Sequence, residues 1–259
     1  MYACNHVDEK KIERMKINNK DFWENEKVIA TQGLIKTSDF ENYMLDEAIK
    51  QYAPFGDIKA IKVFGCGTGR EIESIAEHFH PTRIVASDFA ENMIIRCKEN
   101  LKLWKVDHFT EVFVGDAKDY NTVTCEFDLV TIFNSMMTYV PERKDRVLIF
   151  KNSLQILKPH GSIVGTVHNQ VGSTAKTIYF RIKNLLYFIL KDKVGNRVTG
   201  HNGLEFIGYY YNKKGLIKDL VESGFKNIRV YSLEEYYASI GLEYKRKKGY
   251  NNLIFIAQK

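Results

Sequence analysis

The chain has 259 residues, of which 44% are hydrophobic and 27% charged, and its formal net charge is +6. This length and balance fit one large globular domain, or one domain with an appendage, whose core needs no disulfide framework. The four cysteines lie far apart without a CxxC pair, so zinc-binding and thioredoxin-type functions have no support.

The first twenty residues are polar and carry charges of both signs, without the apolar core of a signal peptide. No run of about 18 uncharged apolar residues occurs, so we expect no membrane span and a cytoplasmic protein. The basic run 245–248 is interpreted as a solvated loop. A contact with RNA, a membrane surface or a phosphorylated partner is the alternative for this run.

The first part of the chain is predicted to be helical. After a leader over 1–20, apolar residues recur at helical spacing over 22–30 and 40–52, and a Pro-Phe-Gly turn ends the second helix. We therefore expect a helical N-terminal cap over 1–57.

From residue 58 to residue 168, short apolar strands alternate with helices. The predicted strands are 60–64, 83–87, 110–114, 127–133 and, after a turn at 158–161, 162–167. Apolar runs of this kind are typical of parallel strands buried on both faces, and their alternation with helices predicts an α/β doubly wound sheet. Ligands of such sheets bind at the carboxyl ends of the strands. Those ends carry Gly65, Asp88, Asp116, Asn134 and His168.

An insertion is predicted over 169–212 and a C-terminal completion of the core sheet over 213–259. The insertion begins with an apolar helix over 174–191, followed by a Gly/Asn-rich loop and three tyrosines at 209–211. We interpret the helix as a lid or a dimer face, with a membrane-surface role as the less favoured alternative. The final segment is expected to form a helix over 213–222 and strands over 225–233 and 253–258.

The glycine-rich turn after the first strand is the central motif. Its glycines at 65, 67 and 69 let the backbone approach a ligand, and the helix that follows offers free N–H groups. The dinucleotide fingerprint requires a third glycine where this chain has Arg70, which argues against a dinucleotide. Asp88 can accept the hydroxyls of a ribose, and the acid at 116 suits an adenine amine. These positions favour an adenosine ligand without a pyrophosphate.

Five motifs in order, over about residues 58–168, resemble the class I S-adenosylmethionine-dependent methyltransferases, and most closely their small-molecule methyltransferase-domain group. The motifs are Phe64-Gly65-Cys66-Gly67-Thr68-Gly69, Asp88-Phe89-Ala90-Glu91-Asn92-Met93, Gly115-Asp116-Ala117, Phe127-Asp128-Leu129-Val130 and Leu157-Lys158-Pro159-His160-Gly161-Ser162. The resemblance implies a Rossmann-like seven-stranded sheet, mostly parallel with an antiparallel last strand, together with helical N-terminal and inserted lid elements. It implies S-adenosylmethionine as the cofactor and no metal.

The resemblance also assigns residues to parts of the cofactor. It implies contacts of the methionine part with Gly65, Cys66 and Gly67, of the ribose with Asp88, of the adenine with Phe89, Met93, Asp116 and Ala117, and of the sulfonium with Asn134. The family usually carries an acid two residues before the first glycine, where this chain has Val63. The contact to the amino group of the cofactor therefore has no assigned residue.

The residues expected to meet the methyl acceptor are aromatic or imidazole side chains. Methyl transfer is an in-line displacement, so the enzyme chiefly aligns donor and acceptor. His168 is the candidate general base because its ordinary pKa suits that role, and a hydrogen-bonded structural histidine is the alternative. Tyr139 is expected to shape the pocket. Tyr210 and Tyr211 either close the pocket or pack on the core.

The acceptor is expected to be a small polar metabolite or biosynthetic intermediate, methylated on oxygen or nitrogen. The Asn/Asp-Pro-Pro-Tyr/Phe signature of amino methyltransferases is absent after the fourth strand, and no RNA-binding module is evident. An RNA methyltransferase and a catalytically silent cofactor-binding partner subunit stay open as alternatives. A homodimer is also considered.

Overall fold

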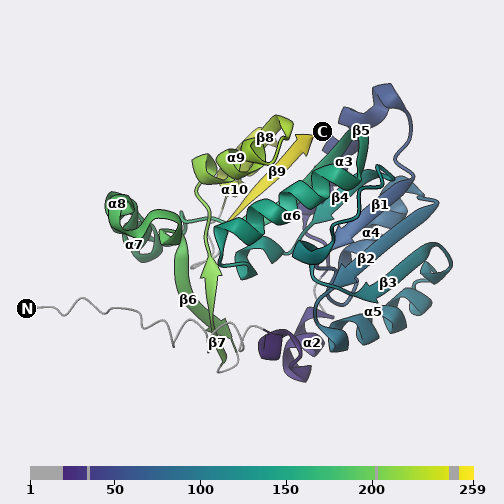
Figure 1. The fold of residues 1–259 in the computed structure, drawn as a ribbon, viewed down its shortest axis with the longest axis horizontal. Helices are drawn as coiled ribbons and strands as arrows, with labels where there is room; N and C mark the ends of the chain where they lie inside the picture. The colour runs from purple at the N-terminus through teal and green to yellow at the C-terminus, as the bar shows by residue number, and fades with distance from the viewer. Residues whose placement is uncertain (1–19, 34–35, 202–203, 245–250) are drawn as a thin grey trace, which may run out of the picture.

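The computed structural model describes residues 20–33, 36–201, 204–244 and 251–259. A twisted sheet crosses the molecule with helices on both faces, and a small hairpin and two short helices extend from one end (Figure 1). The predictions for the leader before residue 20 and for the basic run 245–248 lie outside the described residues.

The central sheet has seven strands in the order β3-β2-β1-β4-β5-β9-β8. These strands are β1 (Ala60–Phe64), β2 (Arg83–Asp88), β3 (Thr110–Val114), β4 (Phe127–Ile132), β5 (Leu157–His168), β8 (Lys226–Ser232) and β9 (Asn252–Gln258). The first five pair in parallel, whereas β9 is antiparallel to both of its neighbours. The predicted fold class is confirmed. The strand order reverses beside β1, and a sheet of this kind binds ligands at the carboxyl ends next to that point.

Two apolar cores lie on opposite faces of the sheet. One face is covered by α3 (Asp39–Tyr52), α4 (Arg70–Phe79), α5 (Glu91–Leu103) and α10 (Leu233–Ser239). The other face is covered by α6 (Arg143–Ile156) and α9 (Lys213–Glu222). Successive side chains of a strand point alternately into the two cores. Both faces of the strands are therefore apolar, and the strands appear in the sequence as apolar runs without alternation.

Outside the insertion, the structure differs from the predicted elements at three places. The expected turn 158–161 lies within β5, where the pairing register with β4 shifts and His160 adopts a left-handed φ of 67°. The expected helix 22–30 is interrupted, because the side chain of Asn25 caps a new helix, α2 (Glu26–Gln32), by accepting from the N–H of Lys27 at 3.0 Å. A short α10, which was not predicted, follows β8.

The insertion contains more regular structure than its sequence indicates. Its predicted long helix is two helices, α7 (Thr174–Leu185) and α8 (Tyr187–Leu190), and its predicted loop is a hairpin of β6 (Asn196–His201) and β7 (Leu204–Tyr209). This hairpin is a separate two-stranded sheet. In the part of the chain that the structure describes, no helix combines the length and hydropathy needed to cross a bilayer.

Candidate cofactor and acceptor site

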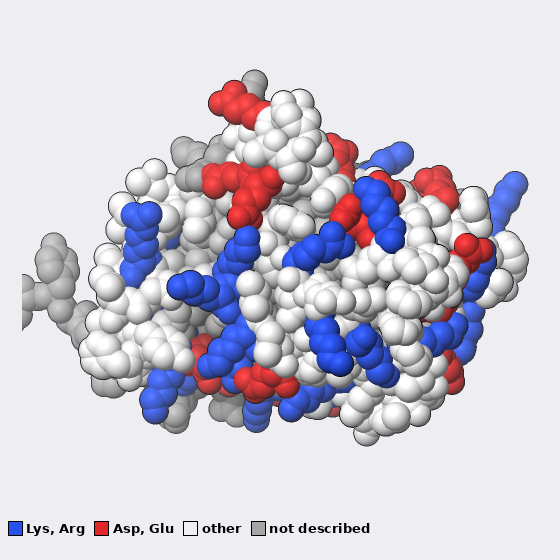
Figure 2. Space-filling view, turned by 90° about the horizontal axis from the view of Figure 1, so that it is seen from above, with Lys and Arg blue, Asp and Glu red and all other residues white. Residues whose placement is uncertain are grey.

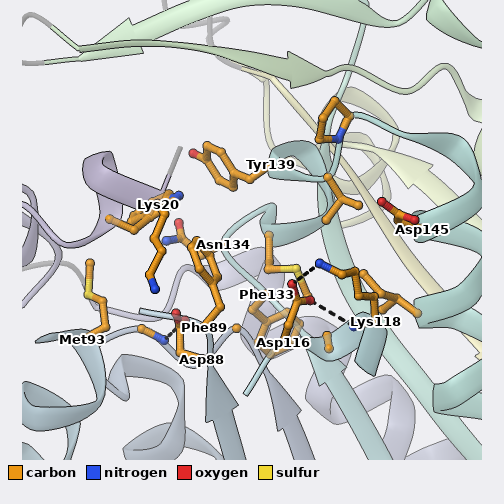
Figure 3. A pocket seen from close by; sticks show the side chains of 18 of the residues that line it. Lys20, Asp88, Phe89, Met93, Asp116, Lys118, Phe133, Asn134, Tyr139 and Asp145 are labelled. Carbon is orange, nitrogen blue, oxygen red and sulfur yellow. Dashed lines mark hydrogen bonds and ion pairs between the residues drawn. The ribbon is translucent and has the colours of Figure 1, made fainter. Parts of the chain in front are cut away.

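A cavity of about 310 Å³ lies at the carboxyl ends of β1, β2 and β4. Figure 3 shows around it side chains from residues 88–145, among them Asp88, Asp116 and Tyr139, together with Lys20 from the N-terminal part of the chain. The predicted site residues that line it are Gly65, Gly67, Asp88, Phe89, Met93, Asp116, Ala117, Asn134 and Tyr139. Residues widely separated in the sequence are thus brought together at the edge where the sheet topology places a ligand.

The glycine turn brings bare backbone to the floor of the cavity. Gly65 and Gly67 have left-handed φ values of 66° and 51°. A Cβ on Gly65 would lie 2.4 Å from Cγ of Met136, so no side chain fits there. A Cβ on Gly67 would have no neighbour nearer than Sδ of Met93 at 4.0 Å, so it would project into the space of the cavity. The turn is therefore shaped to let another molecule approach the chain.

The carboxyl of Asp88 is held by the turn and by the start of the next helix. It accepts from the N–H of Gly67 at 2.8 Å and from the N–H of Ala90 at 2.9 Å. Asp88 is buried, and burial raises its pKa to about 6 against the lowering effect of these two bonds. An ionised carboxyl offers about four acceptor positions, so capacity is left for donors from a ligand.

At the end of β3, the carboxyl of Asp116 forms a tight pair with Lys118. Nζ of Lys118 lies 2.7 Å from Oδ2 of Asp116, and the backbone N–H of Lys118 donates to the same carboxyl at 3.1 Å. Both side chains line the cavity, as Figure 3 shows. A carboxylate and an ammonium group therefore lie beside the apolar wall to which Ala117 contributes.

The loop after β4 carries two consecutive residues in left-handed backbone conformation. Asn134 and Ser135 have φ values of 52° and 57°. The N–H of Asn134 donates to Glu41 at 3.1 Å, and its side-chain amide donates to Gln32 at 3.0 Å. Strain of this kind in non-glycine residues concentrates at functional sites, where the surrounding contacts hold it.

An aromatic wall closes the cavity from the N-terminal side. The ring of Trp23 packs edge-on against Tyr139 with centroids 4.8 Å apart, and Phe206 from the hairpin packs at 5.2 Å from Tyr139. Glu24, next to Trp23, accepts from the N–H groups of Glu91 and Asn92 at 2.8 and 2.9 Å. The N-terminal segment is thereby fastened to the start of α5, with its tryptophan over the cavity.

Four of the predicted site residues are absent from the lining of this cavity. Cys66 is buried beneath the turn. His168 is half-buried, with its ring centroid 6.4 Å from that of Tyr139 and 5.3 Å from that of Tyr210. Desolvation, and next the charge of Lys176, hold the pKa of His168 well below its usual value, so the imidazole is neutral at neutral pH. His168 and Tyr210 form a layer behind Tyr139.

Tyr211 belongs to a buried polar network. Its hydroxyl accepts from Nε of Arg146 at 2.9 Å and donates to Asp219 at 3.0 Å. The same arginine donates to the carbonyls of Val140 and Pro141 at 2.9 and 2.7 Å. Val140 and Pro141 do line the cavity, so this network fixes the wall from behind.

Position 63 carries no acid, and an acid from another element reaches the strand ends instead. Val63 is fully buried in the core, whereas Glu41 of α3 reaches the strand ends and pairs with Arg70 at 2.6 Å. Burial raises the pKa of Glu41, but the charge and hydrogen bond of Arg70 outweigh it, so the pKa lies below its usual value. Its contact with the N–H of Asn134 places a carboxylate beneath the loop that faces the cavity.

Sequence reasoning missed several lining residues. Lys20, Trp23 and Gln32 come from the N-terminal helices, Lys118 directly follows the motif that ends at Ala117, and Asp145 comes from the first turn of α6. The aromatic pair Phe22-Trp23 in an otherwise polar leader is the one signal that could have indicated the N-terminal wall.

Known proteins resemble the segment of the chain that supplies most of the cavity-lining residues. Residues 61–161 match the family model described as methyltransferase domain. A carboxy-S-adenosyl-L-methionine synthase from Shewanella oneidensis is 32% identical over 102 residues, which are 39% of this chain and 40% of that protein. The chain thus spans about two fifths of the length of that curated relative.

Solved structures resemble the chain over most of its length. A methyltransferase of the S-adenosylmethionine-dependent kind from Methanosarcina mazei superposes with a TM-score of 0.62 at 20% identity, covering 87% of this chain and 99% of that one. The N-methyltransferase NodS from Bradyrhizobium japonicum, in complex with S-adenosyl-l-homocysteine, gives a TM-score of 0.55 at 14% identity and covers 96% and 97%. At these identities the likeness concerns the fold.

The matched domain and the sheet topology together define an α/β protein that carries a methyltransferase domain over residues 61–161. Its fold is that of S-adenosylmethionine-dependent methyltransferases, whose cofactor is S-adenosylmethionine. The residues present fit that group: Gly67 leaves open space where a side chain would stand, and Asp88 retains acceptor capacity for ribose hydroxyls.

Proposed function

We propose that the chain transfers a methyl group from S-adenosylmethionine to oxygen or nitrogen of a small-molecule acceptor. The observation that carries this proposal is the meeting, in one cavity, of the predicted adenosine contacts with the aromatic wall of Trp23 and Tyr139. A volume of about 310 Å³ is in the range of small-molecule sites, which supports a compact acceptor.

The chain's own residues would divide the work. The carboxyl of Asp88 would hold the ribose, the bare turn at Gly65 and Gly67 would admit the methionine part, and Phe89 and Met93 would flank the adenine. When bound, the cofactor supplies an electrophilic methyl group on a positively charged sulfur. Tyr139 and Trp23 would stabilise that charge with their ring faces, exclude water and align the acceptor for in-line attack.

The second reactant would be selected by residues outside the matched domain. The segment shared with the carboxy-S-adenosyl-L-methionine synthase covers 102 residues. Trp23 and Phe206, which complete the aromatic wall, lie outside the matched residues 61–161. This supports the use of a common cofactor core with an acceptor end particular to this chain.

The proposal is tested by offering methyl-labelled S-adenosylmethionine to the protein with a filtered pool of small metabolites and, separately, with total RNA. We expect label in the small-metabolite fraction, and its loss in the Asp88→Ala variant, whose cofactor affinity is measured by calorimetry. Label confined to RNA would overturn the proposal. So would tight cofactor binding with no transfer to either pool, because that is the behaviour of a silent partner subunit.

A further inference from the structure

The helices of the insertion present apolar side chains outward. Ile178, Ile182 and Leu185 of α7 are spaced four and three residues apart, so they share one helical stripe, and all three are exposed. Phe180, on the opposite side of the helix, is buried. The helix α7 therefore has two apolar faces: one is buried against the protein, and the other is exposed to solvent.

The next helix continues this surface. Tyr187, Phe188 and Ile189 of α8 are also exposed, and Phe188 retains 73% of its accessible surface. Eight of the twenty large hydrophobic residues exposed in the described part of the chain fall within the twelve residues 178–189. Scattered apolar residues need no explanation, whereas a concentration of this kind marks an interaction site. We give the name α7–α8 surface to six of these exposed side chains: Ile178, Ile182, Leu185, Tyr187, Phe188 and Ile189.

The charge around the α7–α8 surface is mainly positive. Residues 174–197 contain six lysines and arginines, of which Arg181, Lys191 and Lys193 are exposed, and a single acid, Asp192. That acid lies 3.8 Å from Arg143 of α6, on the body of the molecule. Figure 2 shows that the end of the molecule carrying α7 and α8, at the left in both views, is mainly white and blue. An exposed apolar surface with a basic border complements a layer that is apolar inside and anionic outside.

We propose that the α7–α8 surface docks this protein on the surface of an anionic lipid bilayer. The apolar side chains would enter the boundary between head groups and acyl chains, and the basic side chains would face the anionic lipid head groups. A second copy of the chain is a poorer occupant, because an isologous contact brings the same cations together. The helices lie on the bilayer and do not cross it, in keeping with their length.

The docking element is continuous with the wall of the cavity. The chain runs from α8 through one short 3-10 helix (Lys191–Lys193) into the hairpin β6–β7, whose Phe206 packs on Tyr139. Docking would therefore hold the aromatic end of the cavity near the bilayer. The docking itself does not depend on the proposed methyl transfer, so the two can fail separately.

The experiment is co-sedimentation of the full chain with vesicles of phosphatidylcholine alone and of phosphatidylcholine mixed with phosphatidylserine. We expect binding to the mixed vesicles that weakens as salt is added. The paired substitution Leu185→Ser and Phe188→Ser should lower the partition coefficient by roughly tenfold or more, because both side chains would be buried in the lipid. The pair Arg181→Gln and Lys193→Gln should weaken binding to mixed vesicles only.

The matched control is Leu103→Ser, which removes an equally exposed leucine (74% of its surface accessible, against 78% for Leu185) from the end of α5. It should leave vesicle binding unchanged, and circular dichroism and cofactor affinity in solution should be unchanged in every variant. Equal binding to neutral and mixed vesicles would overturn the proposal. Failure to bind vesicles, with a dimer that the paired Leu185 and Phe188 substitution dissociates in gel filtration, would also overturn it and assign the surface to self-association.

Discussion

Glu41 and Arg70 form an ion pair, 2.6 Å between Oε1 and Nη2, that is almost completely buried at the start of α4. Arg70 also donates to the carbonyl of Lys36 at 3.0 Å, and Glu41 accepts from the N–H of Asn134 at 3.1 Å. Arg70, whose position argues in the sequence against a dinucleotide, therefore ties the start of α4 to α3, and Glu41 ties α3 to the loop that faces the cavity. The pair is the link between the N-terminal cap and the cofactor turn.

The first prediction concerns this pair. Arg70→Ala leaves a buried carboxylate without its partner, and we expect a loss of about 3–5 kcal/mol in the free energy of unfolding, measured with urea. The double variant Glu41→Met with Arg70→Met should lose much less, because no buried charge is left alone. If the double variant is as unstable as Arg70→Ala, the unpaired charge is not the cause of the loss.

The second prediction concerns Asp88 and pH. Its pKa of about 6 means that acidification below pH 6 protonates the carboxyl and removes acceptors for ribose hydroxyls. Calorimetry should show that the affinity for S-adenosylhomocysteine falls as pH drops through this range, by up to about tenfold for each pH unit. Asp88→Asn should bind weakly at every pH and show a flatter profile. If the wild-type affinity stays constant between about pH 5 and pH 8, the carboxyl of Asp88 does not bind the ribose.

The raised pKa of Asp88 also determines whether its contribution to the free energy of unfolding rises or falls with pH. The ordinary pKa of the carboxyl is 3.8, so between 3.8 and about 6 the unfolded chain has released a proton that the folded, ligand-free protein retains. The contribution of Asp88 to the free energy of unfolding therefore decreases as pH rises through this window. Asp88→Asn should abolish that contribution in urea titrations carried out without cofactor.

The third prediction separates the two glycines of the turn. Gly67→Ala should cost about 1–2 kcal/mol of stability for its left-handed φ and should reduce cofactor affinity, because the new methyl group projects into the cavity. Gly65→Ala adds a collision with Met136 and should cost more stability. Urea unfolding and calorimetry distinguish the two effects. Unchanged cofactor affinity in a folded Gly67→Ala variant would show that the ligand does not approach this part of the turn.

The fourth prediction concerns His168. We expect His168→Ala to reduce turnover on the order of 10–100-fold while cofactor affinity changes little, because the imidazole lies behind Tyr139 and away from the adenosine contacts. Its lowered pKa implies a neutral ring, so wild-type turnover should show no ionisation of this histidine near pH 6.5. Equal loss of turnover and affinity, or no loss, would argue against a role of His168 in positioning Tyr139.

The sequence predicts the parallel core well because its signals are local. Apolar runs, a glycine turn and an acid at the end of β2 lie within one short stretch each, and the strand-end rule then places them at one edge. The wall of Trp23, the lysine at 20 and the pair of Glu41 with Arg70 depend on how α2 and α3 pack on the sheet. No spacing along the chain indicates that packing.

The insertion shows a second reason why secondary structure predicted from the sequence can be wrong. The hairpin β6–β7 is separate from the main sheet, and the glycines at 195 and 200, directly before and within β6, are typical of a loop. Its Gly195 is required by a close approach, since a Cβ there would lie 2.5 Å from the carbonyl oxygen of Tyr210. Loop composition and a strand can therefore coincide where the backbones of two segments nearly touch.

The position of Trp23 gives the protein a spectroscopic reporter of its own. The chain has two tryptophans, and the second, Trp104, packs against the core beside α5. A Trp104→Phe variant would leave a single indole emitter at the cavity wall, 4.8 Å from the ring of Tyr139. Its emission wavelength and quenching should follow occupancy of the cavity in real time, so candidate acceptors can be ranked by titration before any product is known.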